Sequence, residues 1–168
     1  MNKSPSIHLK AYRCPADGRE IHYATALLRR DSNTQTTSIL DADNPSNAPS
    51  KIGACWVFFY PMGPNRRLLE AVISSNYAPK FECDKDVLFL CINRPGKGGT
   101  SSSAATEQPL NEVTAPDERR HINATCNDVI TILDYYGISK TNLLYMCAGS
   151  TFAYSFASQY PERTKDTS

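Results

Sequence analysis

The sequence predicts an α/β protein in which an N-terminal antiparallel hairpin precedes three strand–helix units of a mostly parallel sheet. Three observations favour this class. Two strand-like segments meet at a turn sequence near the N-terminus, three short apolar runs typical of buried strands follow, and helix-like segments come after those runs. The 168 residues are enough for one domain with its own core.

The hairpin comprises residues 7–14 and 20–30, which are joined by the turn sequence Pro15-Ala16-Asp17-Gly18. Both segments mix polar and apolar side chains, which is typical of antiparallel strands near a sheet edge. Residues 31–50 are rich in Ser, Thr, Asn, Asp and Pro. We interpret them as a flexible loop or an insertion.

Three continuous apolar runs follow, and each has the length of a buried strand. They cover residues 54–60, 87–92 and 143–146. A helix is expected after each run, over residues 67–77, from an N-cap at Asp117 to a stop at Gly137, and over residues 148–160. Residues 101–116 are expected to form a Ser-rich loop.

Composition argues against several classes of function. The net charge of +1, with basic pairs scattered along the chain, gives no reason to expect a nucleic-acid partner. No segment approaches the ~20 apolar residues of a membrane span. None of the six cysteines forms a CxxC pair, so we expect neither a metal site nor a cofactor. The first residues precede no apolar stretch typical of a secretory signal, and the expected location is the cytoplasm.

The third apolar run leads into Tyr145-Met146-Cys147-Ala148-Gly149, and this junction is the main candidate site. A nucleophile at a sharp strand-to-helix turn is exposed at a helix N-terminus, where backbone N–H groups favour negative charge. Cys147 occupies the apex, and the next two residues are small. The alternative is an ordinary strand–helix junction with a buried cysteine. Ser150 is a rival nucleophile, but Phe152 is too large for the position two residues after it.

Three other features are candidate parts of a site. The turn containing Gly63 follows the first apolar run, so its backbone N–H could bind an oxyanion. Residues 94–100 are rich in glycine, but their order differs from that of a phosphate-binding loop. His121 begins the second expected helix at the same sheet edge as Cys147, and is the candidate base. An exposed surface histidine is the simpler interpretation.

Together these segments resemble the α/β-hydrolase superfamily, over residues 54–163. Residues 58–64 resemble its oxyanion segment, residues 91–101 resemble its Asp-Arg-Pro-Gly-x-Gly-x-Ser segment, and residues 143–163 resemble its nucleophile elbow and following helix. Uncharacterised hydrolase-like proteins of fungi and protists are similar in these segments. The resemblance implies a partial α/β-hydrolase fold across residues 1–168, truncated because the family's catalytic acid and histidine lie on later strands.

The resemblance also implies roles for individual residues. Cys147 takes the nucleophile position, and backbone N–H groups of Met62 or Gly63 and of Ala148 form the oxyanion hole. The sequence departs from the family pattern where Tyr145 replaces a small residue. Further departures are Tyr60, Pro61 and Pro64, in a segment that is usually rich in His and Gly.

Two functions from different classes remain open. The first is hydrolysis of an ester, thioester or related acyl bond of a small molecule. The second is a non-catalytic module that binds a small ligand or a protein partner at the carboxyl edge of the sheet. Residues 143–146 would form an apolar sheet edge, so we also expect poor solubility or homo-oligomers paired through this edge.

Overall fold

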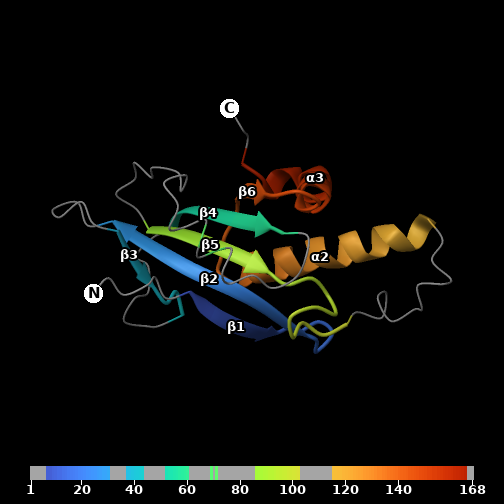
Figure 1. Ribbon diagram of the computed structural model, residues 1–168, viewed down its shortest axis with the longest axis horizontal. Helices are drawn as coiled ribbons and strands as arrows, with labels where there is room; N and C mark the ends of the chain where they lie inside the picture. The colour runs from blue at the N-terminus through green and yellow to red at the C-terminus, as the bar shows by residue number, and fades with distance from the viewer. Residues whose placement is uncertain are drawn as a thin grey trace.

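The computed structural model describes residues 7–30, 37–43, 52–60, 69, 71, 86–102 and 115–165 (Figure 1). Its elements are the strands β1 (His8–Arg13), β2 (Glu20–Arg30), β3 (Thr37–Leu40), β4 (Ile52–Phe59), β5 (Asp86–Ile92) and β6 (Asn142–Tyr145), the helices α2 (Ala115–Tyr135) and α3 (Gly149–Gln159), and the short 3-10 helix η4 (Pro161–Arg163). The predicted strands are therefore confirmed to within two residues at each end.

The strands form one sheet in the order β1-β2-β5-β4-β6, with β3 also paired to β2. The pairs of β2 with β1, β3 and β5 are antiparallel, whereas β4 is parallel to both β5 and β6. This is the predicted hairpin followed by a parallel sheet. The parallel strands β4, β5 and β6 end at one edge of the sheet, which we call the carboxyl edge, and β2 begins there because it runs in the opposite direction.

Apolar side chains pack on both faces of the sheet. The helices α2 and α3 lie on one face (Figure 1), where Val129, Leu133 and Phe156 pack against side chains of β2, β4 and β5. On the opposite face Leu69 is fully buried with Phe58 and Phe89. Residues 69 and 71 are helical, in agreement with the helix expected over residues 67–77, whose other residues lie outside the described part of the chain. Burial on both faces explains why β4 and β5 are continuously apolar.

The expectation that residues 31–50 form a loop was wrong in part, because residues 37–40 form β3. The polar composition concealed two apolar side chains on opposite faces of the sheet, because Leu40 packs into the core beneath the helices and Ile39 into the core on the other face. The remaining residues of this segment, apart from residues 41–43, lie outside the described part of the chain.

The start of α2 was also misplaced. The helix begins at Ala115, so Asp117 lies within its first turn and is not the N-cap, and the Ser-rich loop ends before residue 115. The predicted stop is confirmed, since Gly137 has a φ of 64° and the Ile138 N–H donates to the Leu133 carbonyl at 2.8 Å. This is a common way for a helix to end, because glycine adopts the left-handed conformation without strain.

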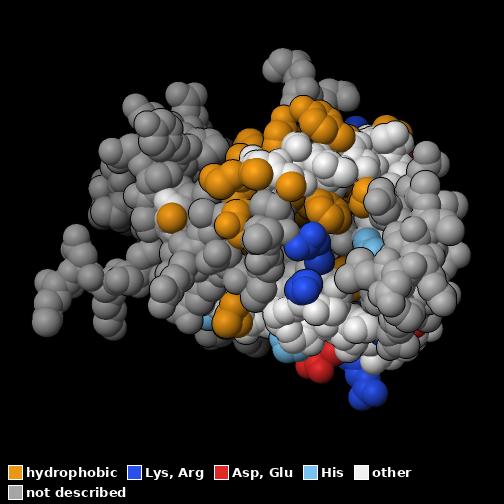
Figure 2. Space-filling view, turned by 45° about the vertical axis from the view of Figure 1, so that its right-hand side comes forward, with side chains coloured by type: hydrophobic (Ala, Val, Ile, Leu, Met, Phe, Trp, Pro, Cys, Tyr) orange, Lys and Arg blue, Asp and Glu red, His pale blue; other side chains and the backbone are white. Residues whose placement is uncertain are grey.

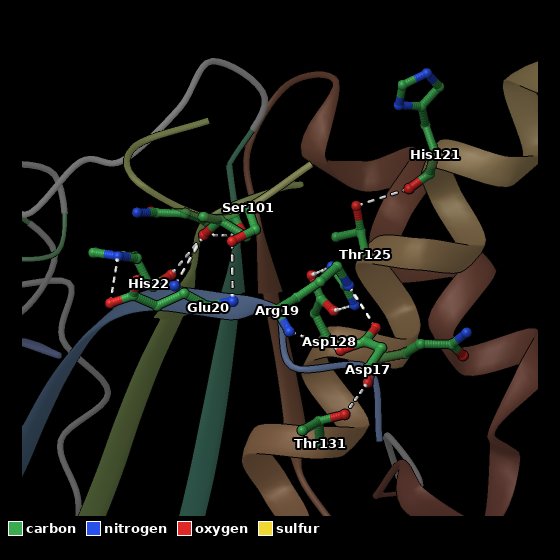
Figure 3. A network of polar contacts seen from close by, with 12 residues as sticks. Asp17, Arg19, Glu20, His22, Ser101, His121, Thr125, Asp128 and Thr131 are labelled. Atoms are coloured by element: carbon green, nitrogen blue, oxygen red, sulfur yellow. Dashed lines mark hydrogen bonds and ion pairs between the residues drawn. The ribbon is translucent and has the colours of Figure 1, made fainter. Parts of the chain in front are cut away.

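A buried ion pair joins the hairpin to α2 (Figure 3). Arg19, which follows the hairpin turn, donates to both carboxylate oxygens of Asp128, at 2.7 and 3.5 Å. The Asp128 side chain is only 1% exposed. Burial raises the pKa of Asp128, and the Arg19 guanidinium offsets this effect only in part. The ion pair places the carboxyl-edge end of the hairpin against the middle of α2.

Candidate functional site

The junction between β6 and α3, which we call the elbow, is a sharp turn at Cys147. Cys147 has a φ of 51°, and no other non-glycine residue in the described ranges has a positive φ. This left-handed conformation is strained for a residue with a Cβ, and such strain is concentrated at functional sites. The Cys147 side chain is exposed to solvent. The alternative interpretation, a buried cysteine at an ordinary junction, is therefore wrong.

The neighbouring strand requires a small residue at Gly149, two residues after the apex. A Cβ on Gly149 would overlap the carbonyl group of Phe59, the last residue of β4, and would lie 2.8 Å from its carbon atom. The Met146 N–H donates to the same Phe59 carbonyl at 3.3 Å. The end of β4 therefore contacts the elbow on both sides of Cys147, and the close approach excludes any larger side chain at residue 149.

The first turn of α3 leaves a backbone donor at the elbow. The Gly149 N–H is bonded to the Met146 carbonyl at 2.9 Å, and the Ser150 N–H to the Cys147 carbonyl at 3.0 Å. Within the described ranges, the Ala148 N–H has no such partner. This N–H belongs to the residue that follows Cys147. Met62 and Gly63, the other expected donors, lie outside the described residues.

Tyr145, the large residue before the elbow, is accommodated because its side chain points to the surface. Its hydroxyl lies 2.9 Å from that of Tyr154 on α3, and the two ring centroids are 5.4 Å apart. The two side chains are 44% and 63% exposed. Hydrogen bonding to Tyr154 raises the pKa of Tyr145. The pair forms an exposed aromatic contact between β6 and α3, which the spacing of nine residues alone did not predict.

His121, the candidate base, is an exposed residue of α2. His121 lies near the N-terminus of α2, and its imidazole points away from the Arg19–Asp128 ion pair (Figure 3). Its carbonyl accepts a hydrogen bond from the Thr125 hydroxyl at 2.9 Å, as expected within a helix. The imidazole itself is exposed, and no hydrogen bond to Cys147 is present in the part of the chain that the structure describes.

The glycine-rich segment after β5 is a compact turn at the carboxyl edge. Three of its glycines have positive φ angles, and the Lys97 N–H and Thr100 N–H donate to carbonyls within the turn at 3.0 and 2.9 Å. The Thr100 hydroxyl accepts a hydrogen bond from the His22 N–H at 2.9 Å, and the adjacent Ser101–Glu20 contacts are visible in Figure 3. The turn is bound to β2 and does not lead directly into a helix, unlike a phosphate-binding loop.

Arg94 and Phe152 are residues at this edge that the sequence analysis did not assign to a site. The Arg94 guanidinium carbon lies 5.3 Å from the centre of the Phe152 ring, on the first turns of α3. Burial lowers the pKa of Arg94. The Arg-Pro-Gly sequence was a signal for a loop, but the position of the guanidinium depends on α3, which is distant in sequence.

Other features of the described residues do not form a site. No group of three His, Cys, Asp or Glu side chains there could hold a metal ion. Cys14, Cys55, Cys91 and Cys126 are buried, and burial raises the pKa of Cys55 to about 12 and that of Cys126 to about 11. None of the described helices combines the length and the apolar character needed to cross a membrane.

A groove with a volume of about 490 Å³ lies between α2 and α3. It is lined mainly by polar side chains and does not include Cys147, so it adds nothing to the elbow. The lining residues are Ile122, Asn123, Tyr154, Ser155, Ser158 and Gln159.

Neither a protein-family model nor a curated protein matches the sequence significantly. Solved structures do match the fold. An epoxide hydrolase mutant of Vigna radiata has a TM-score of 0.55 and 12% identity, covering 95% of this chain and 36% of the matched one. A 2-hydroxy-6-oxo-6-phenylhexa-2,4-dienoate hydrolase of Rhodococcus sp. strain RHA1 has a TM-score of 0.53 and 11% identity, with 96% and 45% coverage. A predicted CIB-like hydrolase of Thermoplasma acidophilum has a TM-score of 0.54 and 12% identity, with 95% and 60% coverage.

The fold is therefore a partial α/β-hydrolase fold, as the sequence predicted. The chain spans between about a third and three-fifths of the length of these three structures. In this chain, the residue with the strained backbone between β6 and α3 is Cys147.

Proposed function

We propose that the chain belongs to a hydrolase that cleaves an ester, thioester or related acyl bond, with Cys147 as the nucleophile. The observation that carries this proposal is the positive φ of the exposed Cys147, at a junction where Gly149 is packed against Phe59. A strained, exposed thiol at a helix N-terminus is the arrangement that nucleophilic catalysis uses.

In the proposed reaction, the Cys147 sulfur attacks the acyl carbonyl carbon, and a carbon–sulfur bond forms. The carbonyl oxygen becomes negatively charged, and the Ala148 N–H donates to it together with a donor from Met62 or Gly63. The alcohol or thiol then leaves with a proton, and water hydrolyses the acyl-enzyme to release the acid and the free thiol. The bond broken is the original acyl bond.

The proton steps require a general base. His121 is the candidate within this chain, and a histidine supplied by additional sequence or by a partner is the other source. If the base is missing, we expect the acyl-enzyme to form but to hydrolyse slowly. A thiolate can attack the substrate without a general base more readily than a hydroxyl group can.

The second candidate function is a non-catalytic module that binds a small ligand at the carboxyl edge. The absence of a hydrogen bond between His121 and Cys147 within the described residues favours this alternative. The two functions differ in whether the chemistry depends on Cys147.

Thiol labelling and ester turnover distinguish the two functions. A Cys83→Ser background removes the cysteine that lies outside the described residues, and the remaining described cysteines other than Cys147 are buried. In this background we expect iodoacetamide at neutral pH to label Cys147 faster in the folded chain than in the urea-unfolded chain. Labelling should disappear in Cys147→Ala.

The acyl-enzyme is tested with a nitrophenyl ester. We expect a burst of nitrophenolate and a mass increase of one acyl group on Cys147, neither of which occurs in Cys147→Ala. Labelling no faster than in the unfolded chain, together with no acylation, would overturn the hydrolase proposal and support the binding module.

A further inference from the structure

Arg94 lies at the carboxyl edge, and its side chain points towards the elbow side of the sheet. It follows β5 by two residues, whereas the ring beneath its guanidinium belongs to Phe152 on α3, which follows β6. The strand order places β4 between β5 and β6. The side chain therefore reaches the helix that begins at the elbow.

The charge of Arg94 is not neutralised within the described part of the chain. Its Nε atom is buried and has no hydrogen-bond partner there, and no carboxylate forms an ion pair with it. Three other arginines in the described ranges each pair with an aspartate at 2.6–2.7 Å. These are Arg19 with Asp128, Arg29 with Asp86, and Arg163 with Asp134.

An unpaired guanidinium donor is costly and calls for an explanation. A guanidinium stays protonated at any pH at which the protein is folded, and a buried donor without an acceptor costs about 1–3 kcal/mol, or more when it is charged. Native proteins leave few such groups, and an anion or water that is bound in the functional state is a common reason. Burial lowers the pKa of Arg94, which is the direction expected for a cation without a counter-charge.

The position of Arg94 is well defined by its surroundings. The Lys97 N–H donates to the Arg94 carbonyl at 3.0 Å, which closes the turn, and Pro95 is buried. The Phe152 ring holds the guanidinium by a cation–π contact, whose planar geometry leaves the N–H edge free to donate. Phe152 lies three residues after the start of α3, which is ~5 Å along the helix axis. On the face of the molecule drawn in Figure 2, some Lys and Arg side chains lie beside apolar ones.

We propose that Arg94 binds the carboxylate of an anionic acyl substrate at the elbow. This inference rests on the proposed function, because it names the substrate class of that same site. A carboxylate matches the fork of a guanidinium and accepts two parallel hydrogen bonds. The preferred substrates are then esters or thioesters whose acyl chain ends in a carboxylate a few carbons from the scissile bond.

The test measures the charge preference of Cys147 without requiring turnover. Iodoacetate and iodoacetamide react in the same way, since sulfur forms a bond to carbon and iodide leaves, but only iodoacetate carries a carboxylate. In the Cys83→Ser background, we expect the ratio of the iodoacetate rate to the iodoacetamide rate to be about fivefold higher in the folded chain than in urea, which is the factor that one opposite charge ~4 Å from the carboxylate would give in water.

Matched variants assign the preference to Arg94. Arg94→Met should bring the ratio down to that of the unfolded chain, and circular dichroism reports whether the variant is folded. Arg94→Lys should keep most of the ratio. Lys97→Met removes a positive charge from an exposed residue of the same turn and should leave the ratio unchanged. Glutarate should protect Cys147 from iodoacetamide, whereas the neutral glutaramide should not.

The two proposals fail in different ways. An unchanged ratio in Arg94→Met, or equal loss in Lys97→Met, would overturn the role of Arg94 even if Cys147 is highly reactive. Slow reaction of Cys147 with both reagents and no acylation would overturn the hydrolase proposal. If the ratio of the iodoacetate rate to the iodoacetamide rate still depended on Arg94 in that case, Arg94 would bind anions beside a cysteine that is not catalytic.

Discussion

Gly149 lies against Phe59 so closely that a single added carbon atom on the glycine would overlap the phenylalanine carbonyl group. The strand β4 and the first residue of α3 are held together at this point. Phe59 is the last residue of β4, and its carbonyl also accepts a hydrogen bond from the Met146 N–H. A larger side chain at residue 149 would therefore displace the elbow.

Gly149→Ala should therefore destabilise the protein, although alanine favours a helix. We expect the free energy of unfolding to fall by about 1–3 kcal/mol, which is the usual effect of overpacking. Urea denaturation followed by circular dichroism measures this change. Thr151→Ala, at an exposed position of the same helix, is the matched control and should be neutral or slightly stabilising. Equal stability of the two variants would contradict the close contact.

The strain at Cys147 predicts a gain in stability when its Cβ is removed. The left-handed conformation costs about 1–2 kcal/mol for a residue with a Cβ, and glycine avoids this cost. Glycine also loses more conformational entropy on folding, which cancels about half of the gain in stability. Cys147→Gly should thus be ~0.5–1 kcal/mol more stable than Cys147→Ala in urea denaturation. Cys147→Val should be less stable than both, because β-branched residues disfavour a positive φ. A reversed order would show that the elbow is not strained.

The ion pair between Arg19 and Asp128 predicts a pH-dependent loss of stability. Arg19→Met leaves the buried Asp128 carboxylate unpaired, so the free energy of unfolding should fall by about 3–5 kcal/mol at pH 7. Without the guanidinium the pKa of Asp128 rises further above 3.8. The folded variant therefore takes up a proton as the pH falls, and the loss of stability should shrink between pH 7 and pH 4.

Two controls accompany that measurement. Arg13→Met removes an exposed arginine of the same hairpin and should change stability by less than about 0.5 kcal/mol. Arg19→Met combined with Asp128→Leu removes both charges and should recover most of the loss at pH 7. A loss that is independent of pH, or no recovery in the double variant, would show that Asp128 is not ionised in the fold.

The free side of β6 predicts self-association through the sheet edge. Thr141 already bonds along this side, since its N–H donates to the Arg163 carbonyl at 2.8 Å and its carbonyl accepts from the Lys165 N–H at 2.9 Å. Because backbone groups alternate along a strand, those of Leu143 and Tyr145 point the same way, and no strand pairs with them among the described residues. We propose that a second copy of the chain pairs there.

Size-exclusion chromatography with light scattering tests this pairing over a range of concentrations. We expect oligomers for the unmodified chain and a shift to monomer in Tyr145→Lys, because charged side chains on an edge strand block pairing. Tyr154→Lys breaks the same tyrosine contact and adds the same charge, but on α3, and should keep the oligomers. A monomer at every concentration would contradict the proposal.

The sequence predicted the elements of this fold because their signals are local. The apolar runs of β4, β5 and β6, the turn after β1 and the stop at Gly137 depend on neighbouring residues, and each was placed within two residues. β3 was missed because only two of its four residues are apolar, and its pairing with β2 compensates for the weak local signal. The start of α2 was misplaced because Asp117 has the chemistry of a cap but lies inside the helix.

For the candidate site, the sequence by itself determined the apex residue and the small residues that follow it. Only the tertiary structure decided that Cys147 is exposed in a strained conformation, and that His121 makes no contact with it in the described residues. The Arg94 guanidinium likewise meets Phe152 only because the strand order brings β5 and α3 together around β4. A sequence records which residues can turn, pack or ionise, whereas the distances between residues far apart in the chain are set by how the sheet is ordered and where its helices pack.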